Sequence, residues 1–268
     1  MVIRAIVTGA SGRMGRRLIA LMQDDSQYQL AGAVTHAAHA ALGRDAGDLA
    51  GVGTVGIPLV PDLAGVLAAS DVVIDFSVAD ASLTYLQQAA AAGKPMVIGT
   101  TGFTPEQRQE MVRLSQTVPC LLAPNMSVGV QVLFQLLRQA AKLLGPDFDV
   151  EIIEAHHRTK IDAPSGTALR MGDIIAQTRG QRLEDAAVHG RQGNIGRRSD
   201  AEIGIQAIRG GDIVGEHTVM FAGTGERIEL IHRSQSRDNF VRGALRAAHW
   251  IVTQPPGLYG MEEMLQAL

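Results

Sequence analysis

The chain begins with a strand pattern, a glycine-rich turn and a helix pattern in direct succession, and no other stretch constrains its fold as strongly. Residues 2–7 are mostly β-branched, residues 16–22 place apolar side chains at helical spacing, and TGASGRMG stands between them. In this order Gly12 lets the backbone approach a pyrophosphate, Gly15 permits close packing of helix on strand, and the helix N-terminus faces the phosphates. The spacing is G-x-x-G-x-x-G, whereas the usual dinucleotide fingerprint is G-x-G-x-x-G, so a tight turn without a ligand is the alternative.

Alternating strand and helix patterns continue to residue 122. Strand patterns cover residues 29–35, 71–76, 95–100 and 118–122, and helix patterns cover 79–92 and 105–115. Such alternation predicts an α/β fold with a Rossmann-like, doubly wound parallel sheet and helices on both faces. Ligands of such sheets bind beyond the carboxyl ends of the strands, where this chain carries DFS, GTTGF and APNM. The GTTGF turn offers backbone and hydroxyl groups to a nicotinamide and its ribose, although a plain connecting loop has the same composition.

The rest of the chain predicts a second domain. A helix pattern at 128–144 leads into a strand pattern at 148–153, and three further strand patterns at 203–208, 213–221 and 227–232 are separated by GGD and GTGE, turns typical of antiparallel pairing. Residues 179–200 are rich in Gly and Arg without periodic apolar positions, which predicts a long loop or a mobile arm. A last helix pattern at 239–252 is expected to return to the first domain.

These patterns predict the domain organisation. We expect a dinucleotide-binding Rossmann-like domain formed by residues 1–127 and 237–268. We expect residues 128–236 to form an α+β domain with a mostly antiparallel sheet, which would bind the substrate and form subunit contacts.

The sequence EAHHRTKIDAPSGTA, residues 154–168, concentrates the chemistry of the chain. His156 and His157 stand at the end of a strand pattern, where a side chain can leave the core. Lys160 adds an ammonium group, and SGT at 165–167 precedes a helix pattern, so unpaired backbone N–H groups are expected to point outward there. Imidazole and ammonium donors beside an anion-binding turn describe a site for a small acidic substrate that is protonated during the reaction.

Two other interpretations of this stretch stand beside that one. Adjacent histidines at a strand end also occur without a function, and Ser165 is an ordinary helix-capping residue. The two histidines with Glu154 or Asp162 could supply metal ligands, but neighbouring residues of a strand point to opposite faces and no second His or Cys cluster completes a ligand set. The sequence therefore predicts no metal site.

Composition and charge exclude several classes of protein. A net charge of −3 gives no electrostatic basis for binding nucleic acid, and no apolar run is long enough to span a bilayer. Residues 1–8 are too short for a signal sequence and lead directly into the glycine turn. The single cysteine, Cys120, excludes an internal disulfide and lies in an apolar run, so we expect a buried thiol in a cytoplasmic protein.

Five motifs together resemble the dihydrodipicolinate reductase family, whose members are also called 4-hydroxy-tetrahydrodipicolinate reductases. They are GRMG at 12–15, GTTGF at 99–103, EAHHxxK at 154–160, DAPSGTA at 162–168 and GDIVGEH at 211–217. The resemblance covers nearly the whole chain, and the block 154–168 is highly specific. It implies an NAD(P)H-dependent oxidoreductase of lysine and diaminopimelate biosynthesis that reduces 4-hydroxy-tetrahydrodipicolinate to tetrahydrodipicolinate. It also implies a homotetramer assembled through the antiparallel sheets.

The resemblance assigns roles to individual residues. It implies that His156 is the general acid and that Lys160 is a substrate-binding donor needed for catalysis. The residues implied to hold the substrate carboxylates are His157, Gly166 and Thr167. The residues implied to bind the nucleotide are Gly9, Ala10, Ser11, Gly12, Arg13, Met14, Gly99, Thr100, Thr101, Ala123, Pro124, Asn125 and Met126. Two carboxylates need two anchors, and by the chemistry of the side chains we expect the turn at Ser165 to supply one, and Lys160 with Arg237 to supply the other.

The end of the strand pattern at 29–35 bears on the choice of nucleotide. Sites for NADH usually place Asp or Glu there, about 20 residues past the glycines, to bind the ribose hydroxyls. Here Thr35 and His36 occupy positions where many relatives carry an acidic residue followed by a basic one. Without a carboxylate a 2′-phosphate is not repelled, and Thr35, His36 and Arg13 can donate to it. We expect NADPH to be preferred over NADH; the alternative is that His36 and nearby His39 are solvated loop residues.

Two other functions are consistent with the residues. One is a dinucleotide-binding sensor that has lost its chemistry, and the other is a reductase of a different acidic imine or carbonyl compound. The presence of both His156 and Lys160 argues against the sensor.

Overall fold

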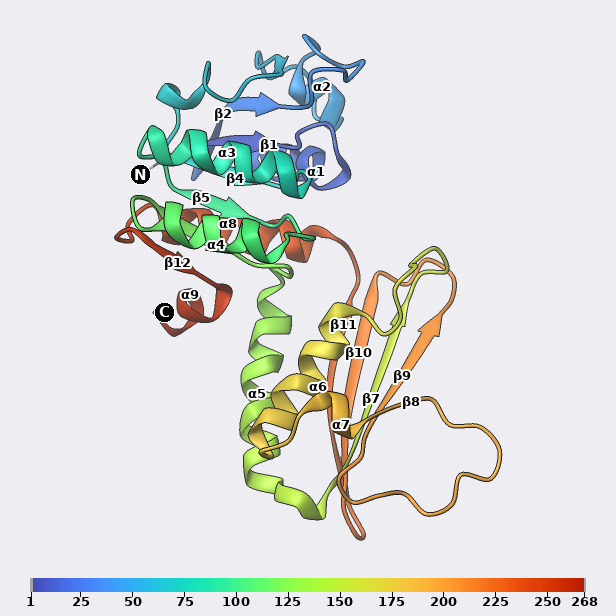
Figure 1. The fold of residues 1–268 in the computed structure, drawn as a ribbon. Coiled ribbons are helices and arrows are strands. Elements are labelled where there is room, and N and C mark those ends of the chain that lie inside the picture. The colour runs from blue at the N-terminus through green and yellow to red at the C-terminus, as the bar shows by residue number, and fades with distance from the viewer. Residues whose placement is uncertain (1, 268) are drawn as a thin grey trace. The chain divides into compact units, whose positions relative to one another are not determined.

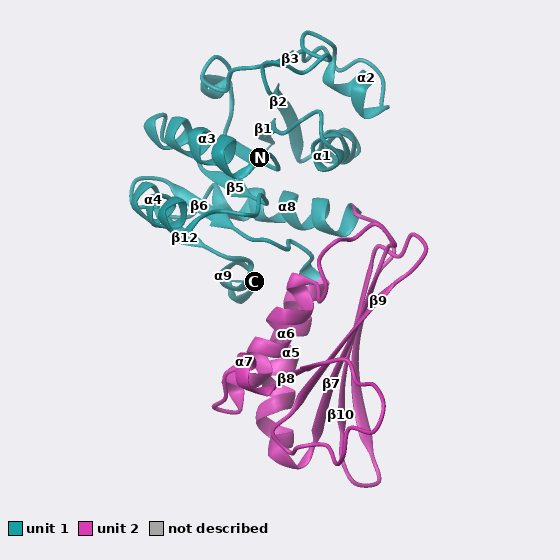
Figure 2. Ribbon diagram, turned by 45° about the vertical axis from the view of Figure 1, so that its right-hand side comes forward, with its two compact units in different colours: residues 1–128, 238–268 teal, residues 129–237 magenta. Residues whose placement is uncertain are grey.

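The computed structural model describes residues 2–267, which form two compact units. Unit 1 comprises the residues up to 128 and those from 238 onward, and unit 2 comprises residues 129–237 (Figure 2). The chain therefore leaves unit 1 once and returns through helix α8 (Asp238–Ile251). Within residues 2–267, no helix has both the length and the apolar character needed to cross a membrane.

Unit 1 is built on a seven-stranded sheet in which the paired strands are all parallel. Its strands are β1 (Ile3–Thr8), β2 (Tyr28–Val34), β3 (Leu59–Val60), β4 (Val72–Asp75), β5 (Met96–Ile98), β6 (Pro119–Leu122) and β12 (Gly257–Tyr259). Their order is β12-β6-β5-β4-β1-β2-β3. The chain builds the sheet outward from β1 in both directions, so the predicted doubly wound parallel sheet is confirmed.

Helices cover both faces of this sheet because alternate strand residues point to opposite sides. The helices are α1 (Arg13–Gln23), α2 (Ala46–Ala50), α3 (Ala79–Ala91), α4 (Pro105–Ser115), α8 and α9 (Met261–Gln266), with a short 3-10 turn at Leu67–Ala69. On one face Ala5 and Val7 pack with buried residues of α1 and α8. On the other face, where α3 and α4 lie (Figure 1), Ile6 packs with buried residues of these two helices.

Cys120 is buried, as the sequence predicted. It lies fully buried in β6, and burial raises the pKa of its thiol to about 12.

Four short elements of unit 1 had no sequence signal. Elements α2, β3, α9 and β12 were not predicted. They contain five, two, six and three residues, too few to show a helical or strand period.

Unit 2 contains a five-stranded mixed sheet. Its strands are β7 (Asp149–His156), β8 (Ala187–His189), β9 (Ile203–Arg209), β10 (Gly215–Ala222) and β11 (Arg227–Ser234), in the order β11-β10-β7-β9-β8. Strand β10 is antiparallel to β7 and β11, whereas β9 is parallel to β7 and β8. The α/β class with an additional α+β unit is thus confirmed. The second sheet is mixed and not mostly antiparallel as expected, because β9 pairs in parallel with β7 and with β8.

The two glycine turns of this sheet have different roles. The GTGE turn at 223–226 joins β10 and β11 in the expected antiparallel pair. The GGD turn at 210–212 does not join paired strands, because β7 lies between β9 and β10. The expectation of pairing there was wrong because a turn reverses the chain without specifying which strand occupies the neighbouring position.

One face of the mixed sheet is covered by helices. The helices of unit 2 are α5 (Val128–Leu144), α6 (Gly166–Thr178) and α7 (Leu183–Ala186), with a 3-10 turn at Gly145–Asp147. Helices α5 and α6 lie along the same side of the strands, where their apolar residues form one core with Ile152, Ile205 and Phe221 (Figure 1). The other face carries Ile208 and Ile231, which are 50% and 45% exposed.

Residues 179–200, predicted to be a loop or mobile arm, are partly regular. Their first part forms α7 and β8, which are too short to show a period. Their second part is held against the sheet by two arginines. Arg191 bonds Glu151 at 2.8 Å and also contacts Glu202, and Arg198 bonds Asp149 at 2.8 Å. The arginines of this segment therefore attach it to strand β7.

Candidate active site

The glycine turn after β1 has the geometry that an anion-binding loop needs. Gly9 has φ +69°, and a Cβ there would lie 2.2 Å from the carbonyl oxygen of Phe76. A Cβ on Gly15 would lie 2.3 Å from the carbonyl oxygen of Gly9, so both positions exclude any side chain. Gly12 is exposed and stands at the N-cap of α1 with no capping side chain. The first turn of an 11-residue helix therefore presents backbone N–H groups without a capping side chain or an acidic residue nearby, which fits a phosphate.

A buried carboxylate organises the loops beside this turn. Asp75, at the end of β4, is fully buried and accepts hydrogen bonds from the hydroxyls of Thr8 at 2.5 Å, Ser77 at 2.6 Å and Thr100 at 2.6 Å. The Thr100 hydroxyl oxygen in turn accepts from the backbone N–H of Ser77 at 2.9 Å. This network ties together the ends of β1, β4 and β5, the three strands around the point where the sheet changes direction.

The structure separates the predicted nucleotide residues of the GTTGF loop by role. Thr100 is 5% exposed and its hydroxyl is engaged with Asp75, so it shapes the loop. Gly99 is required because a Cβ there would lie 2.1 Å from the Phe76 ring. Thr101 is exposed and is the hydroxyl of this loop that a ligand can reach.

The remaining predicted nucleotide residues also lie at this edge of the sheet. Ala123 and Met126, which follow β6, are buried, whereas Pro124 is exposed. Asn125 accepts a hydrogen bond from the backbone N–H of Ser127 at 2.9 Å, which fixes the loop after β6. The structure thus places the ends of β1, β4, β5 and β6 next to one another, in the order expected for a dinucleotide site.

The end of β2 differs in detail from the sequence expectation. Thr35 is 2% exposed, and its hydroxyl lies 2.6 Å from that of Ser11, so the two side chains join the glycine turn to β2. His36 and Arg13 are exposed. The ring of His36 contacts that of His39, with centroids 5.1 Å apart.

In unit 2, one buried carboxylate gathers the groups expected to carry chemistry. Glu154 lies on β7 with its side chain fully buried, and its Oε2 is 2.6 Å from Nδ1 of His156. Arg209, the last residue of β9, donates to both carboxylate oxygens at 2.8 Å. The backbone N–H of Ser165 donates to Oε1 at 3.0 Å. In the parallel register of β7 and β9, Arg209 lies opposite His156. Its side chain therefore reaches Glu154, although Glu154 and Arg209 are 55 positions apart in the chain.

Burial and charge act on His156 in opposite directions. Burial lowers the pKa of His156 from its usual value, and the hydrogen bond and charge of Glu154 raise it in part. The pKa of Glu154 is itself lowered: burial raises it, but hydrogen bonds from Arg209, His156 and Ser165 more than offset burial. Glu154 is therefore the anionic member of this group.

Lys160 and His157 lie on the turn after β7. The Lys160 Nζ lies 2.8 Å from a carboxylate oxygen of Asp162, and the Lys160 ion pair holds the pKa of Asp162 below its usual value. The Asp162 side chain is 54% exposed, so this ion pair faces solvent. Nδ1 of His157 is 2.8 Å from the hydroxyl of Thr159. The side chains of His157 and Lys160 are both partly exposed on this turn.

The turn at Ser165 is a capped helix start, as the sequence predicted. Ser165 is the N-cap of α6, and its hydroxyl accepts from the backbone N–H of Ala168 at 3.2 Å. The structure corrects one expectation, because the backbone N–H of Ser165 is already bonded to Glu154 and does not point outward. Gly166 is exposed with open space above it, and its N–H has no partner within residues 2–267. An anion would approach at Gly166.

His217 belongs to this cluster. It is 4% exposed on β10, its Nε2 lies 3.2 Å from the hydroxyl of Ser165, and its ring centroid is 5.2 Å from that of His156. Burial lowers the pKa of His217 to about 3, so it is neutral at ordinary pH. Of these two contacting imidazoles, His156 is the one able to carry a proton. The sequence offered His217 only as part of the GDIVGEH motif, with no role attached.

Arg209 and Glu154 were not among the predicted site residues, and Arg237 is not joined to the cluster. Arg237 is exposed, and among residues 2–267 it forms no hydrogen bond or ion pair with the groups around Glu154. Arg209 lies between the strand pattern at 203–208 and the GDIVGEH motif at 211–217, and it belongs to neither, so no sequence signal pointed to it. The cation that the structure places at this cluster is Arg209 at the end of β9, and substrate binding by Arg237 stays a prediction.

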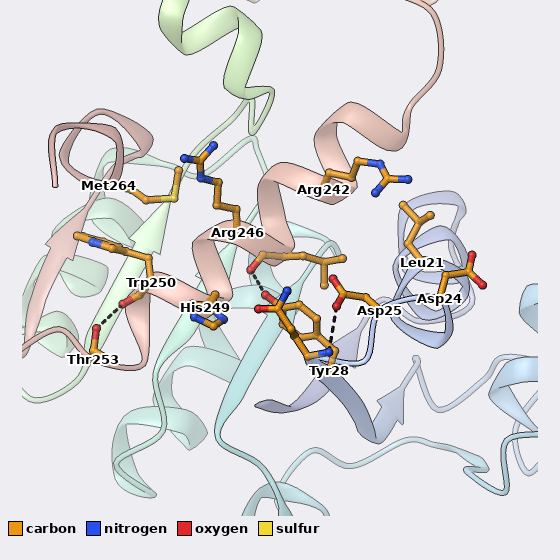
Figure 3. A pocket seen from close by; sticks show the side chains of 12 residues that line it. Leu21, Asp24, Asp25, Tyr28, Arg242, Arg246, His249, Trp250, Thr253 and Met264 are labelled. Carbon is orange, nitrogen blue, oxygen red and sulfur yellow. Dashed lines mark hydrogen bonds between the residues drawn. The ribbon is translucent and has the colours of Figure 1, made fainter. Parts of the chain in front are cut away.

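A cavity of about 710 Å³ lies in unit 1, away from the loops described above (Figure 3). Its lining includes Asp25, Tyr28, Arg246 and Trp250, and the Tyr28 hydroxyl donates to the backbone oxygen of Leu245 at 2.6 Å. Tyr28 begins β2, so the cavity lies at the amino ends of the strands. None of the residues predicted to bind nucleotide or substrate lines it.

Two family models match the chain in sequence. The model described as dihydrodipicolinate reductase, N-terminus, matches residues 3–126, and that described as dihydrodipicolinate reductase, C-terminus, matches residues 129–265. The chain belongs to the dihydrodipicolinate reductase family. The resemblance stated from the motifs is confirmed, and the chain is an oxidoreductase of that family.

Members of the dihydrodipicolinate reductase family from bacteria are similar to the chain over their whole length. Proteins named 4-hydroxy-tetrahydrodipicolinate reductase from Syntrophobacter fumaroxidans and Syntrophus aciditrophicus are 55% and 52% identical to it, each over 98% of both chains. A dipicolinate-bound dihydrodipicolinate reductase from a Paenisporosarcina species has the same fold, with a TM-score of 0.79 at 27% identity over 98% of this chain and 99% of that one. The alternative of a catalytically inactive sensor is not favoured by these relatives.

Proposed function

We propose that the chain reduces 4-hydroxy-tetrahydrodipicolinate to tetrahydrodipicolinate in lysine and diaminopimelate biosynthesis, with His156 as the general acid. The reaction replaces a hydroxyl group of the substrate by hydrogen and releases water, so it consumes one hydride and one proton. The nicotinamide cofactor supplies the hydride when bound. The observation that carries the proposal is the cluster around Glu154, where a half-buried imidazole lies beside an anion-binding turn.

The roles of the substrate-side residues follow from their chemistry. Nδ1 of His156 is engaged with Glu154, so Nε2 is the nitrogen from which a proton reaches the substrate. One substrate carboxylate binds at the Gly166 end of α6, where Thr167 adds a hydroxyl, and Ser165 shapes this turn as its N-cap. Lys160 and His157 bind the other, with the carboxylate of the substrate replacing that of Asp162. Arg237 remains a proposed second cation for the substrate, supplied by the residue before α8.

The nucleotide is proposed to bind along the carboxyl edge of the parallel sheet. The pyrophosphate lies over Gly12 at the start of α1, with the backbone of Gly9 to Met14 around it. The nicotinamide end meets the loops after β5 and β6, where Thr101 and Asn125 offer polar groups. The fit rests on the open, uncapped helix start and on the glycines whose Cβ atoms would collide with backbone.

NADPH is proposed to be preferred over NADH. The support is the residue at the end of β2, where Thr35 takes the place of the carboxylate that holds ribose hydroxyls in NADH sites. The exposed side chains of Arg13 and His36 are available to a 2′-phosphate, and the Ser11–Thr35 contact fixes the loop between them. No acidic residue lies at this position to repel the phosphate.

We further propose a cytoplasmic homotetramer assembled through the open face of the mixed sheet. The exposed isoleucines of β9 and β11 on that face support a subunit contact, since exposed apolar patches commonly mark such interfaces. Sedimentation of the purified protein tests the assembly. A monomer at micromolar concentration would contradict it.

Steady-state kinetics with both nucleotides tests the preference. The ratio of kcat/KM for NADPH to that for NADH is expected to exceed one and to fall in Thr35→Glu, because the new carboxylate repels the 2′-phosphate. Thr35→Ser is the matched control, since it keeps the hydroxyl that contacts Ser11. Equal or better use of NADH by the unaltered protein would refute the preference.

A further inference from the structure

Glu154 accepts four hydrogen bonds from three residues, and these join it to three different parts of the candidate active site. Its two oxygens accept from Nδ1 of His156, from the guanidinium of Arg209 twice, and from the backbone N–H of Ser165. The partners come from the end of β7, the end of β9 and the start of α6. No other carboxylate of unit 2 among residues 2–267 is fully buried.

We propose that Glu154, with Arg209 as its counter-ion, is a positioning residue that fixes the tautomer and orientation of His156. Through its bond to the backbone of Ser165, Glu154 also fixes the position of the proposed carboxylate-binding turn relative to His156. The inference rests on the proposed function for the role of His156 as proton donor. It adds two residues, Glu154 and Arg209, to which neither the motifs nor the family comparison assigns a role.

The tautomer follows from the chemistry of the pair. An ionised carboxylate has no proton to donate, so the 2.6 Å contact requires that Nδ1 of His156 carry the hydrogen. The other nitrogen, Nε2, is then the one that gains and loses a proton. Gly215 on β10 leaves space beside Nε2 of His156. A Cβ on Gly215 would lie 3.1 Å from this nitrogen and would crowd it on the side of β10.

Arg209 keeps Glu154 ionised in a fully buried position. A buried carboxylate without a cation would take up a proton, and a protonated Glu154 could donate to Nδ1 and reverse the tautomer. The two bonds at 2.8 Å supply that cation, and Arg209 also donates to the backbone oxygen of Asp162 at 2.5 Å. Through this bond Arg209 also stabilises the turn that carries Lys160.

The charged and titratable groups that face His156 come from four elements. They are Glu154 on β7, Lys160 on the turn after it, Arg209 on β9 and His217 on β10, with His232 of β11 behind His217. Among these, Glu154 alone favours the protonated form of His156, whereas Lys160 and Arg209 oppose it. Removing the negative charge of Glu154 therefore shifts His156 toward its neutral form.

The test compares Glu154→Gln with Glu151→Gln. Glu151 lies on the same strand, three residues away, and is also paired with arginines, but it is held by Arg191 and Arg198 away from His156. The first readout is histidine side-chain nitrogen NMR of the protein without substrate, with the His156 signal assigned by its loss in His156→Asn. In the unaltered protein neutral His156 should show the Nδ1–H tautomer, and in Glu154→Gln it should titrate about one pH unit lower or more and lose that single tautomer.

The second readout is the pH dependence of turnover. In Glu154→Gln the loss of activity on raising the pH should begin at a pH about one unit lower, because less His156 is protonated, and kcat should fall on the order of 10-fold or more near neutral pH. Glu151→Gln should keep the pH dependence of the unaltered protein. A uniform loss of kcat at all pH values, without movement of the profile, would indicate a structural role and overturn the proposal.

The two readouts separate this inference from the proposed function. If the unaltered protein does not reduce the proposed substrate, the NMR titration still decides whether Glu154 sets the state of His156. A His156 signal that titrates identically in the unaltered protein and in Glu154→Gln would overturn the inference even in an active enzyme.

Discussion

Replacing Arg209 by Met should destabilise the protein through the charge left on Glu154. The side chain of Glu154 is fully buried, and Arg209 supplies two of its hydrogen bonds at 2.8 Å. Removing one partner of a buried ion pair costs about 3–5 kcal/mol of unfolding free energy. Because the Arg209 side chain is 20% exposed, water can reach part of the site, and we expect a loss near the lower end, ~3 kcal/mol.

The loss of unfolding free energy in Arg209→Met should depend on pH. In the unaltered protein the pKa of Glu154 lies below its usual value, so this carboxylate adds stability above that usual value, and the stability is lost as the pH falls through the folded-state pKa. In Arg209→Met, burial is opposed only by His156 and Ser165, so the pKa of Glu154 should rise. The variant should therefore recover part of its deficit as the pH falls from about 7.5 to about 5, where Glu154 takes up a proton.

Urea unfolding followed by far-ultraviolet circular dichroism at two pH values measures the loss. The double variant Glu154→Gln, Arg209→Met is the control, and it should be ~1–2 kcal/mol more stable than Arg209→Met because no charge remains buried. A deficit below about 1 kcal/mol, the range of an exposed ion pair, would contradict the view that Arg209 neutralises a buried charge on Glu154. So would a deficit that is the same at both pH values.

Two further predictions concern the two ligand sites. Replacing His156 or Lys160 by Ala should lower turnover on the order of 100-fold or more while nucleotide affinity, measured by calorimetry, stays nearly unchanged; near-normal turnover of His156→Ala would remove the general-acid assignment. Gly12→Ala should weaken nucleotide binding with little loss of melting temperature, because its Cβ approaches only the backbone oxygen of Gly9 and would occupy space at the proposed phosphate site. Gly15→Ala should lower the melting temperature, since its Cβ would lie 2.3 Å from backbone; equal melting temperatures for the two glycine variants would contradict this account.

The elements with clear local signals were predictable from the sequence. Helices α4 and α5 begin and end at the predicted residues. For α4 the reason is visible in the chain: Pro105 occupies the first turn, and Thr104 and Gln107 form a reciprocal capping box. The apolar runs of the parallel strands were equally readable because both faces of the sheet are buried.

The contacts that assemble the candidate site were not predictable in this way. Arg209 meets Glu154 only because β9 pairs in parallel with β7, and the pairing of strands far apart in the chain has no local signal. The GGD turn at 210–212 predicted that β9 and β10 are antiparallel neighbours, whereas β7 lies between them. The same limit explains the missed role of His217, since its burial depends on the strands on both sides of β10. The motifs predicted His156 as a site residue, but they did not predict that Glu154 and Arg209 act on its protonation.

The most direct test of the proposed function is the oxidation of NADPH on addition of freshly generated 4-hydroxy-tetrahydrodipicolinate, followed by absorbance. We expect substrate-dependent oxidation by the unaltered protein and on the order of 100-fold less by His156→Ala at equal nucleotide occupancy. Saturable nucleotide binding without any substrate-dependent oxidation would contradict the proposed function.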